Sequence, residues 1–301
     1  MSDTPYKTVL IAGNDRERLP ATIDKAATIE HYTGAALRVA ATHYHEVAEL
    51  SDADLSPAET QALIDHLVAA QAKDLAAALD PYRARVADLD TSIVWTKDVA
   101  AGLIAEATRI DASLLIKPRQ AHRSLGAYLH APIDWRLMRD APCPVLFTAN
   151  KSWDAPRVVL AALDAADVNH MPLNRSILRH AQAFQRILDA KLHLVCTYPD
   201  LNQTVSGYQV ATDFTALKEQ MQRTRTERLT ALVGELELTD VELHVVEGKP
   251  RRVIENLADR IGATLTVVGT AARTGIGKLL IGNTAEDISQ SLTTDLLTVR
   301  E

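Results

Sequence analysis

Short apolar runs alternate along this chain with longer stretches in which apolar residues recur every three or four positions. The short runs are rich in β-branched residues and almost entirely apolar, which is typical of strands covered on both faces. The longer stretches show helical spacing in three sets: Leu63, Leu67, Ala70 and Leu75; Ile177, His180, Phe184, Ile187 and Leu188; and Val253, Ile254, Leu257 and Ile261. Alternating strands and helices predict an α/β fold with open, mostly parallel sheets.

The pattern occurs twice. Residues 8–15 recur as residues 158–165, residues 37–42 recur as 192–197, and from Lys117 onward the halves align without a gap, with Lys117 on Gly269. We therefore predict two tandem Rossmann-like domains, at residues 1–150 and 151–301, joined by the polar segment 150–156. Ligands of such sheets bind at the carboxyl ends of the strands, beside the point where the strand order reverses.

Composition excludes several classes of protein. The net charge is −7 and only 4% of residues are aromatic, which argues against binding to nucleic acid. The sequence contains neither an apolar run of about 18 residues nor an N-terminal secretory signal, so we expect a cytoplasmic protein without a membrane partner. Cys143 and Cys196 lie in strand-like runs and are expected to be buried thiols.

The most informative segment follows the apolar strand that ends at Gly269. A glycine-rich loop leads to Gly282, Asn283 and Thr284, which open an amphipathic helix. Bare backbone lets an anion approach closely, and a helix N-terminus supplies free N–H groups, so the segment could form a phosphate cradle. It could equally be an ordinary capped helix, because Asn283 and Glu286 have the spacing of a capping box.

With this loop and the duplication, each half resembles a universal stress protein domain, and the whole chain resembles the tandem, E-type members of that family. The family signature has two residues between its first and second glycines and nine between the second and third. Here it runs Gly269, Ala272, Gly282, then Asn283-Thr284. Gly248-Lys249-Pro250 matches the family's Gly-x-Pro. Asp164 closes the first strand of the second half, as an aspartate commonly does in nucleotide-binding members.

The resemblance implies that the second half binds ATP or a related nucleotide, with Mg²⁺ as an accompanying ion. The residues that it assigns to the ligand are Ala162, Leu163, Asp164, Val195, Gly248, Gly269, Thr270, Ala271, Ala272, Arg273, Gly282, Asn283, Thr284 and Ala285. Asp164 could hold Mg²⁺ or a ribose hydroxyl, or it could cap the following turn. Ala272 departs from the signature and would crowd the phosphates, whereas Arg273 adds positive charge.

The first half keeps less of the signature. Lys117, Gln120 and His130 stand where the family has glycines, and only Gly126 remains in the loop. Lysine and histidine side chains would fill the space that a phosphate needs, so we expect no ligand there in the family's usual mode. The basic residues of this loop could grip an anion in another pose or simply be solvated.

No catalytic machinery is apparent. The sequence lacks a Gly-x-Ser-x-Gly elbow and a Walker-type loop, so we expect a binding protein with at most weak ATPase activity. His43 and His45 share a strand face, but no third metal ligand accompanies them, and we expect no metal site.

Stress-response signalling through nucleotide binding is thus the leading hypothesis. The alternatives are a ligand-independent scaffold and a carrier of another small molecule that uses segments 46–60 and 199–215 as lids. The apolar strands at 145–147 and 296–299 would pair in this family, which predicts an intramolecular pseudo-dimer and leaves a homodimer of the tandem chain open.

Overall fold

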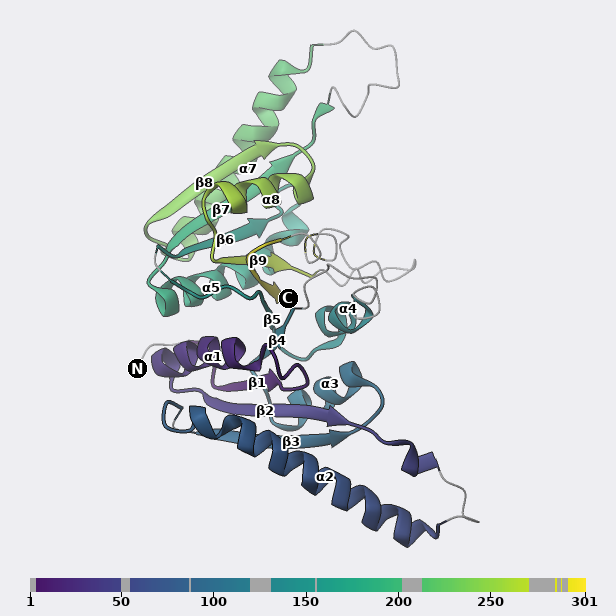
Figure 1. Ribbon diagram of the computed structural model, residues 1–301. Helices are drawn as coiled ribbons and strands as arrows, with labels where there is room; N and C mark the ends of the chain where they lie inside the picture. Colours follow the sequence, from purple (N-terminus) through teal and green to yellow (C-terminus); the bar gives the residue numbers. More distant parts are fainter. Residues whose placement is uncertain are drawn as a thin grey trace. The chain divides into compact units, whose positions relative to one another are not determined.

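The computed structural model describes residues 4–49, 55–86, 88–119, 131–154, 156–201, 213–270 and 292–301, together with Ala285 and Ile288. The chain divides into two compact units, residues 1–152 and 153–301 (Figure 1). Each unit is built on a parallel sheet and is described by itself below.

Unit 1 has five parallel strands in the order β3-β2-β1-β4-β5, so the strand order reverses beside β1. The strands are β1 (Thr8–Ala12), β2 (Ala36–His43), β3 (Leu89–Trp95), β4 (Leu114–Pro118) and β5 (Val145–Thr148). The helices between them are α1 (Leu19–Thr33), η1 (Glu46–Glu49), α2 (Pro57–Leu79), η2 (Asp80–Tyr82), α3 (Val99–Arg109) and α4 (Ala131–Asp140).

Unit 2 repeats this plan, with the order β8-β7-β6-β9-β10 and the reversal beside β6. Its strands are β6 (Val158–Leu163), β7 (Lys191–Tyr198), β8 (Val241–Glu247), β9 (Leu265–Gly269) and β10 (Asp295–Val299). Its described helices are η4 (Val168–His170), α5 (Met171–Leu188), α7 (Thr215–Glu235) and α8 (Pro250–Arg260). The predicted α/β fold, with mostly parallel sheets, is therefore confirmed in both halves.

The central strands are buried as their apolar sequences predict. Val9, Leu10 and Ile11 of β1 and Val159 and Leu160 of β6 are fully buried. Strands of this kind need helices on both faces, and in Figure 1 α7 and α8 cover opposite faces of the sheet of unit 2. The two cysteines are free and buried, as predicted.

The apolar stripe predicted on the long helix of unit 1 is buried only at one end. Leu75 and Leu79 of α2 are fully buried, whereas Leu63 is 36% exposed and Ala70 is also exposed. The first turns of α2 are held locally instead, because Ser56 and Glu59 form a capping box. Among the described residues, no helix is long and apolar enough to cross a membrane.

Candidate functional site

A cavity of about 520 Å³ lies in unit 2 at the carboxyl ends of the parallel strands. Its walls come from the ends of β6, β7 and β9, from the turn between β8 and α8, and from α5. The strand order reverses beside β6, so the cavity lies where open α/β sheets hold their ligands. Its volume is in the range of small-molecule sites.

Half of the positions assigned to the ligand line this cavity, and they come from five separate segments. They are Ala162, Leu163, Asp164, Val195, Gly248, Gly269 and Ala285. Thr270 is described but is not among the lining residues: it is buried, and both its N–H and its hydroxyl donate to the carbonyl of Val299, at 2.8 and 3.3 Å. Ala271, Ala272, Arg273, Gly282, Asn283 and Thr284 lie outside the described residues.

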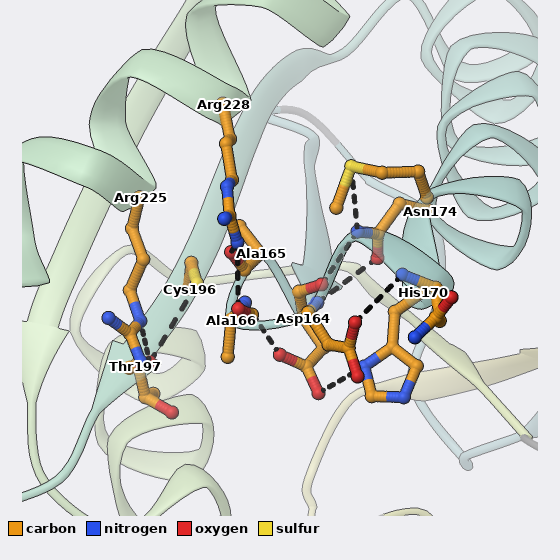
Figure 2. Close-up of polar contacts among 12 residues, drawn as sticks. Asp164, Ala165, Ala166, His170, Asn174, Cys196, Thr197, Arg225 and Arg228 are labelled. Atoms are coloured by element: carbon orange, nitrogen blue, oxygen red, sulfur yellow. Dashed lines mark hydrogen bonds and ion pairs between the residues drawn. The ribbon is translucent and has the colours of Figure 1, made fainter.

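Asp164 follows directly after β6, and its carboxylate faces the turn that leads to α5 (Figure 2). One carboxylate oxygen accepts the backbone N–H of Ala166 at 3.0 Å, and the other lies 2.8 Å from Nδ1 of His170. Asp164 therefore caps the turn, which was one of its two expected roles. Its side chain is still 57% exposed, so it also remains open to a ligand in the cavity.

The turn after β6 is held from two helices. Asn174 of α5 bonds both backbone groups of Asp164: its amide Nδ2 donates to the carbonyl at 2.8 Å, and its Oδ1 accepts the N–H at 3.1 Å. Arg228 of α7 donates from one guanidinium nitrogen to the carbonyls of Ala165 and Ala166, both at 2.7 Å (Figure 2). These contacts place the Asp164 carboxylate at the rim of the cavity.

The cavity wall also carries positive charge from Lys249 and Arg225. Lys249 is the N-cap of α8, and its side chain makes no capping hydrogen bond; the first turn of α8 also has no acidic residue. The helix thus begins at the cavity with its positive dipole end uncompensated by a carboxylate. Arg225 adds a guanidinium, which is oriented by donating to the carbonyls of Thr197 and Met221 at 3.0 and 3.2 Å.

For two glycines in the cavity wall, the structure explains why a larger residue would be unfavourable. Gly248 has φ = +138°, a conformation that other residues adopt only with strain. A Cβ atom on Gly269 would lie 2.7 Å from Cδ2 of Leu173 and 2.9 Å from Cδ1 of Ile177. A side chain at position 269 would therefore force Leu173 and Ile177 of α5 to shift, whether or not a ligand approaches.

Unit 1 fills the corresponding positions with its own side chains. Lys117, which aligns with Gly269, lies 2.8 Å from the carboxylate of Asp134 in α4, and both side chains are 12% exposed. Asn14, which aligns with Asp164, bonds to Thr42 at the end of β2, donating to its carbonyl at 2.8 Å and accepting its N–H at 3.1 Å. Both positions thus have side-chain or backbone partners within unit 1.

The comparisons with known proteins agree with the duplicated fold. The universal stress protein family matches residues 5–148 and again residues 157–300. The chain belongs to the universal stress protein family. It is similar to universal stress protein E of Photorhabdus laumondii, with 28% identity over 228 residues, which cover 71% of this chain and 69% of that protein.

Two further relatives extend along most of this universal stress protein. The universal stress protein E homolog of Haemophilus influenzae is 28% identical over 262 residues, covering 85% of this chain and 82% of that protein. The crystal structure of a functionally unknown protein from Pseudomonas aeruginosa has a TM-score of 0.71 and 27% identity, and covers 98% of this chain and 92% of that one. The tandem arrangement is thus shared across these chains.

Several lining residues of this universal stress protein were not expected from its sequence. Lys249 belongs to the Gly-x-Pro motif but was not expected to take part in ligand binding. Asn174, His170 and Arg225 lie in no recognisable sequence motif. Asn174 reaches the site because it lies in α5, one of the helices that the reversal of strand order places beside β6. Two segments were expected to be lids. In the second of them, segment 199–215, Pro199 and Asp200 line the cavity, whereas residues 202–212 lie outside the described residues.

Proposed function

We propose that this universal stress protein binds ATP or a related nucleotide in the cavity of unit 2 and acts as a regulatory binder in the stress response. The main support for the proposal is that positions from distant parts of the sequence come together at one site. Seven positions assigned on family resemblance, from segments more than 100 residues apart, line one cavity at the reversal of strand order.

The charges of the cavity support an elongated ligand with one anionic end. The start of α8 and Lys249 offer donors and positive charge to phosphate groups. Asp164 would hold a ribose hydroxyl, or Mg²⁺ where the ion accompanies the nucleotide. The apolar side chains of Val195, Ile177 and Ile254 would pack against a base or a ribose.

Expected binding can be tested on purified protein. Denaturing the protein and separating the released small molecules should reveal a nucleotide, and adding ATP with Mg²⁺ should raise the melting temperature. Asp164→Ala should weaken ATP binding, whereas Asp167→Ala, on the same turn but outside the cavity wall, should leave it unchanged. Absence of both a co-purified nucleotide and a thermal shift would refute the proposal.

Two alternatives remain as outcomes of that experiment. An apolar molecule released in place of a nucleotide would favour a carrier, a function consistent with the apolar part of the cavity wall formed by Leu163, Leu173 and Val268. Release of nothing would favour a ligand-independent scaffold. The intramolecular pseudo-dimer, a cytoplasmic location and a weak ATPase activity stay predictions, testable by solution scattering, fractionation and phosphate release, respectively.

A further inference from the structure

Two histidines and a glutamate, none of which lines the cavity, meet on neighbouring strands of unit 2. His193 lies on β7, and Glu242 and His244 lie on β8. Nδ1 of His193 is 2.9 Å from Nε2 of His244, and oxygens of the Glu242 carboxylate lie 3.7 Å from the first nitrogen and 3.6 Å from the second. One ligand atom from each of the three residues therefore lies within 4.8 Å of the other two.

The strands themselves produce this cluster. His193 is directly opposite Glu242 in the register of β7 and β8, and His244 is opposite Val195, two residues further along. Residues two apart on a strand share a face, so all three side chains leave the same face of the sheet. The side chains of His193 and His244 are only 9% and 13% exposed, whereas Glu242 is 65% exposed and gives access from solvent.

The spacing suits a metal ion. A tetrahedral ion with bonds of about 2.0–2.1 Å holds its ligand atoms roughly 3.3 Å apart. The nitrogen–nitrogen separation of 2.9 Å, and the nitrogen–oxygen separations of 3.7 Å to one Glu242 oxygen and 3.6 Å to the other, lie on either side of that value. The two imidazole rings are within 4° of parallel, with centroids 5.2 Å apart, so at present the two nitrogens share a hydrogen bond across the gap. A small rotation of each ring would let an ion replace that proton.

Unit 1 provides an internal comparison at the same place in the sheet. Arg38 is opposite Asp90 in the register of β2 and β3, as His193 is opposite Glu242, and Ser92 takes the place of His244. Arg38 forms an ion pair with Asp90 and lies 3.8 Å from Glu106 of α3, which also accepts a hydrogen bond from Ser92 at 2.6 Å. Unit 1 thus fills this site with an arginine and two carboxylates.

Unit 2 does not repeat that arrangement. α3 and α8 have the same length and each ends in arginine, so the place of Glu106 in α3 falls to Leu257 in α8. Unit 2 therefore has no carboxylate at the position of Glu106, and an imidazole with a second imidazole beside it stands in the place of the arginine.

We propose that His193, Glu242 and His244 bind a divalent transition-metal ion such as Zn²⁺. Two imidazole nitrogens and one carboxylate are a ligand set for zinc and its neighbours, not for Mg²⁺ or Ca²⁺, which prefer oxygen alone. Water would complete the coordination on the exposed side of Glu242. Because β8 is an edge strand of this sheet, the ion would join that edge to β7 and stabilise unit 2.

Chelator-treated protein without a histidine tag should bind one equivalent of Zn²⁺ by calorimetry, and Co²⁺ at the same site should show the visible absorption of tetrahedral coordination. The double variant His193→Arg/His244→Ser introduces the residues of unit 1 and leaves Glu242 to pair with the arginine. It should fold and lose more than about 100-fold in affinity. Glu242→Gln, at an exposed position, should fold normally and bind about tenfold more weakly.

The control variant His31→Ala/His66→Ala removes two exposed histidines of unit 1 and should keep full affinity. Circular dichroism establishes the fold of each variant. The proposal fails if the native protein binds no Zn²⁺ or Co²⁺, or if both the double variant and Glu242→Gln bind as tightly as the native chain. Equal losses in the control variant would likewise overturn it, since binding would then be spread over surface histidines.

Discussion

Lys117 and Asp134 form an ion pair of 2.8 Å at the end of β4, at the position where unit 2 has Gly269. Both side chains are 12% exposed, so each charge depends on the other. Removing one partner of a buried pair leaves an uncompensated charge. We expect Asp134→Asn to lower the free energy of unfolding by about 3 kcal/mol, measured by urea titration.

The pair also offers its own control. Lys117→Met/Asp134→Leu removes both charges and replaces them with apolar groups, so most of the lost stability should return. A double variant as unstable as Asp134→Asn would show that side-chain packing, not charge, decides stability at this position.

Gly269 should resist substitution because of α5. In Gly269→Ala, the new Cβ would lie within 3 Å of Leu173 and Ile177, and we expect a loss of about 1–3 kcal/mol in thermal or urea unfolding. The loss should shrink in a Leu173→Ala background, since the nearest atoms are then gone. Gly234→Ala in α7 is the matched control: nothing lies within 4 Å, and alanine should be neutral or slightly stabilising there.

Arg228 should affect ligand affinity without touching the ligand. It holds the turn that carries Asp164 through the carbonyls of Ala165 and Ala166. If the cavity binds ATP, Arg228→Ala should weaken binding several-fold and cost roughly 1–3 kcal/mol of stability. Arg223→Ala, an exposed position on the same helix, should change neither quantity in calorimetry or unfolding.

His180 should make unit 2 less stable in mild acid. Desolvation lowers its pKa to about 4, with Arg179 adding to the effect, against an ordinary value of 6.5. Between these two values the unfolded chain binds the proton and the folded chain does not, so stability falls as pH falls through this window. The loss should reach up to about 3 kcal/mol near pH 4.

The neutral variant His180→Gln isolates this contribution. It should show a flatter dependence of unfolding free energy on pH between 6.5 and 4 than the native chain. An unchanged slope would mean that other groups cause the acid sensitivity.

The two thiols should be nearly inert in the folded protein. Burial raises the pKa of Cys143 to about 12 and also raises that of Cys196. For Cys143 the reactive thiolate is thereby about a thousandfold scarcer at pH 8 than for an ordinary thiol. A disulfide reagent should react slowly with native protein and at once with both cysteines in denaturant. Rapid reaction of the native chain would contradict the buried positions.

The architecture was predictable because periodicity, duplication and parallel strands all point the same way. Helix α5 buries Ile177, Phe184 and Leu188 as its spacing indicates. Helix α2 shows the limit of that reasoning: its spacing is equally regular, yet Leu63 remains exposed, and only Leu75 and Leu79 in the last turns are buried. A periodic pattern states which face is apolar, not how far the neighbouring layer reaches.

The sequence predicted those site residues that lie at the ends of strands, but not those that helix packing brings to the cavity. Asp164 and Gly269 stand at strand ends, and the ends of adjacent parallel strands meet at one edge. Lys249 and Arg225 were missed because their role depends on where α7 and α8 cross the sheet. The pair His193 and His244 was missed for a related reason, since a register between strands 51 residues apart leaves no local signal.

The contact of Leu173 and Ile177 with the bare backbone at Gly269 has a consequence for the two halves as exchangeable parts. A chimera that carried β4 and its loop into unit 2 would bring the long side chain of Lys117 against both of these residues, without the matching helix of its own half. A chimera of the two units should therefore exchange a strand together with the helix that packs against it.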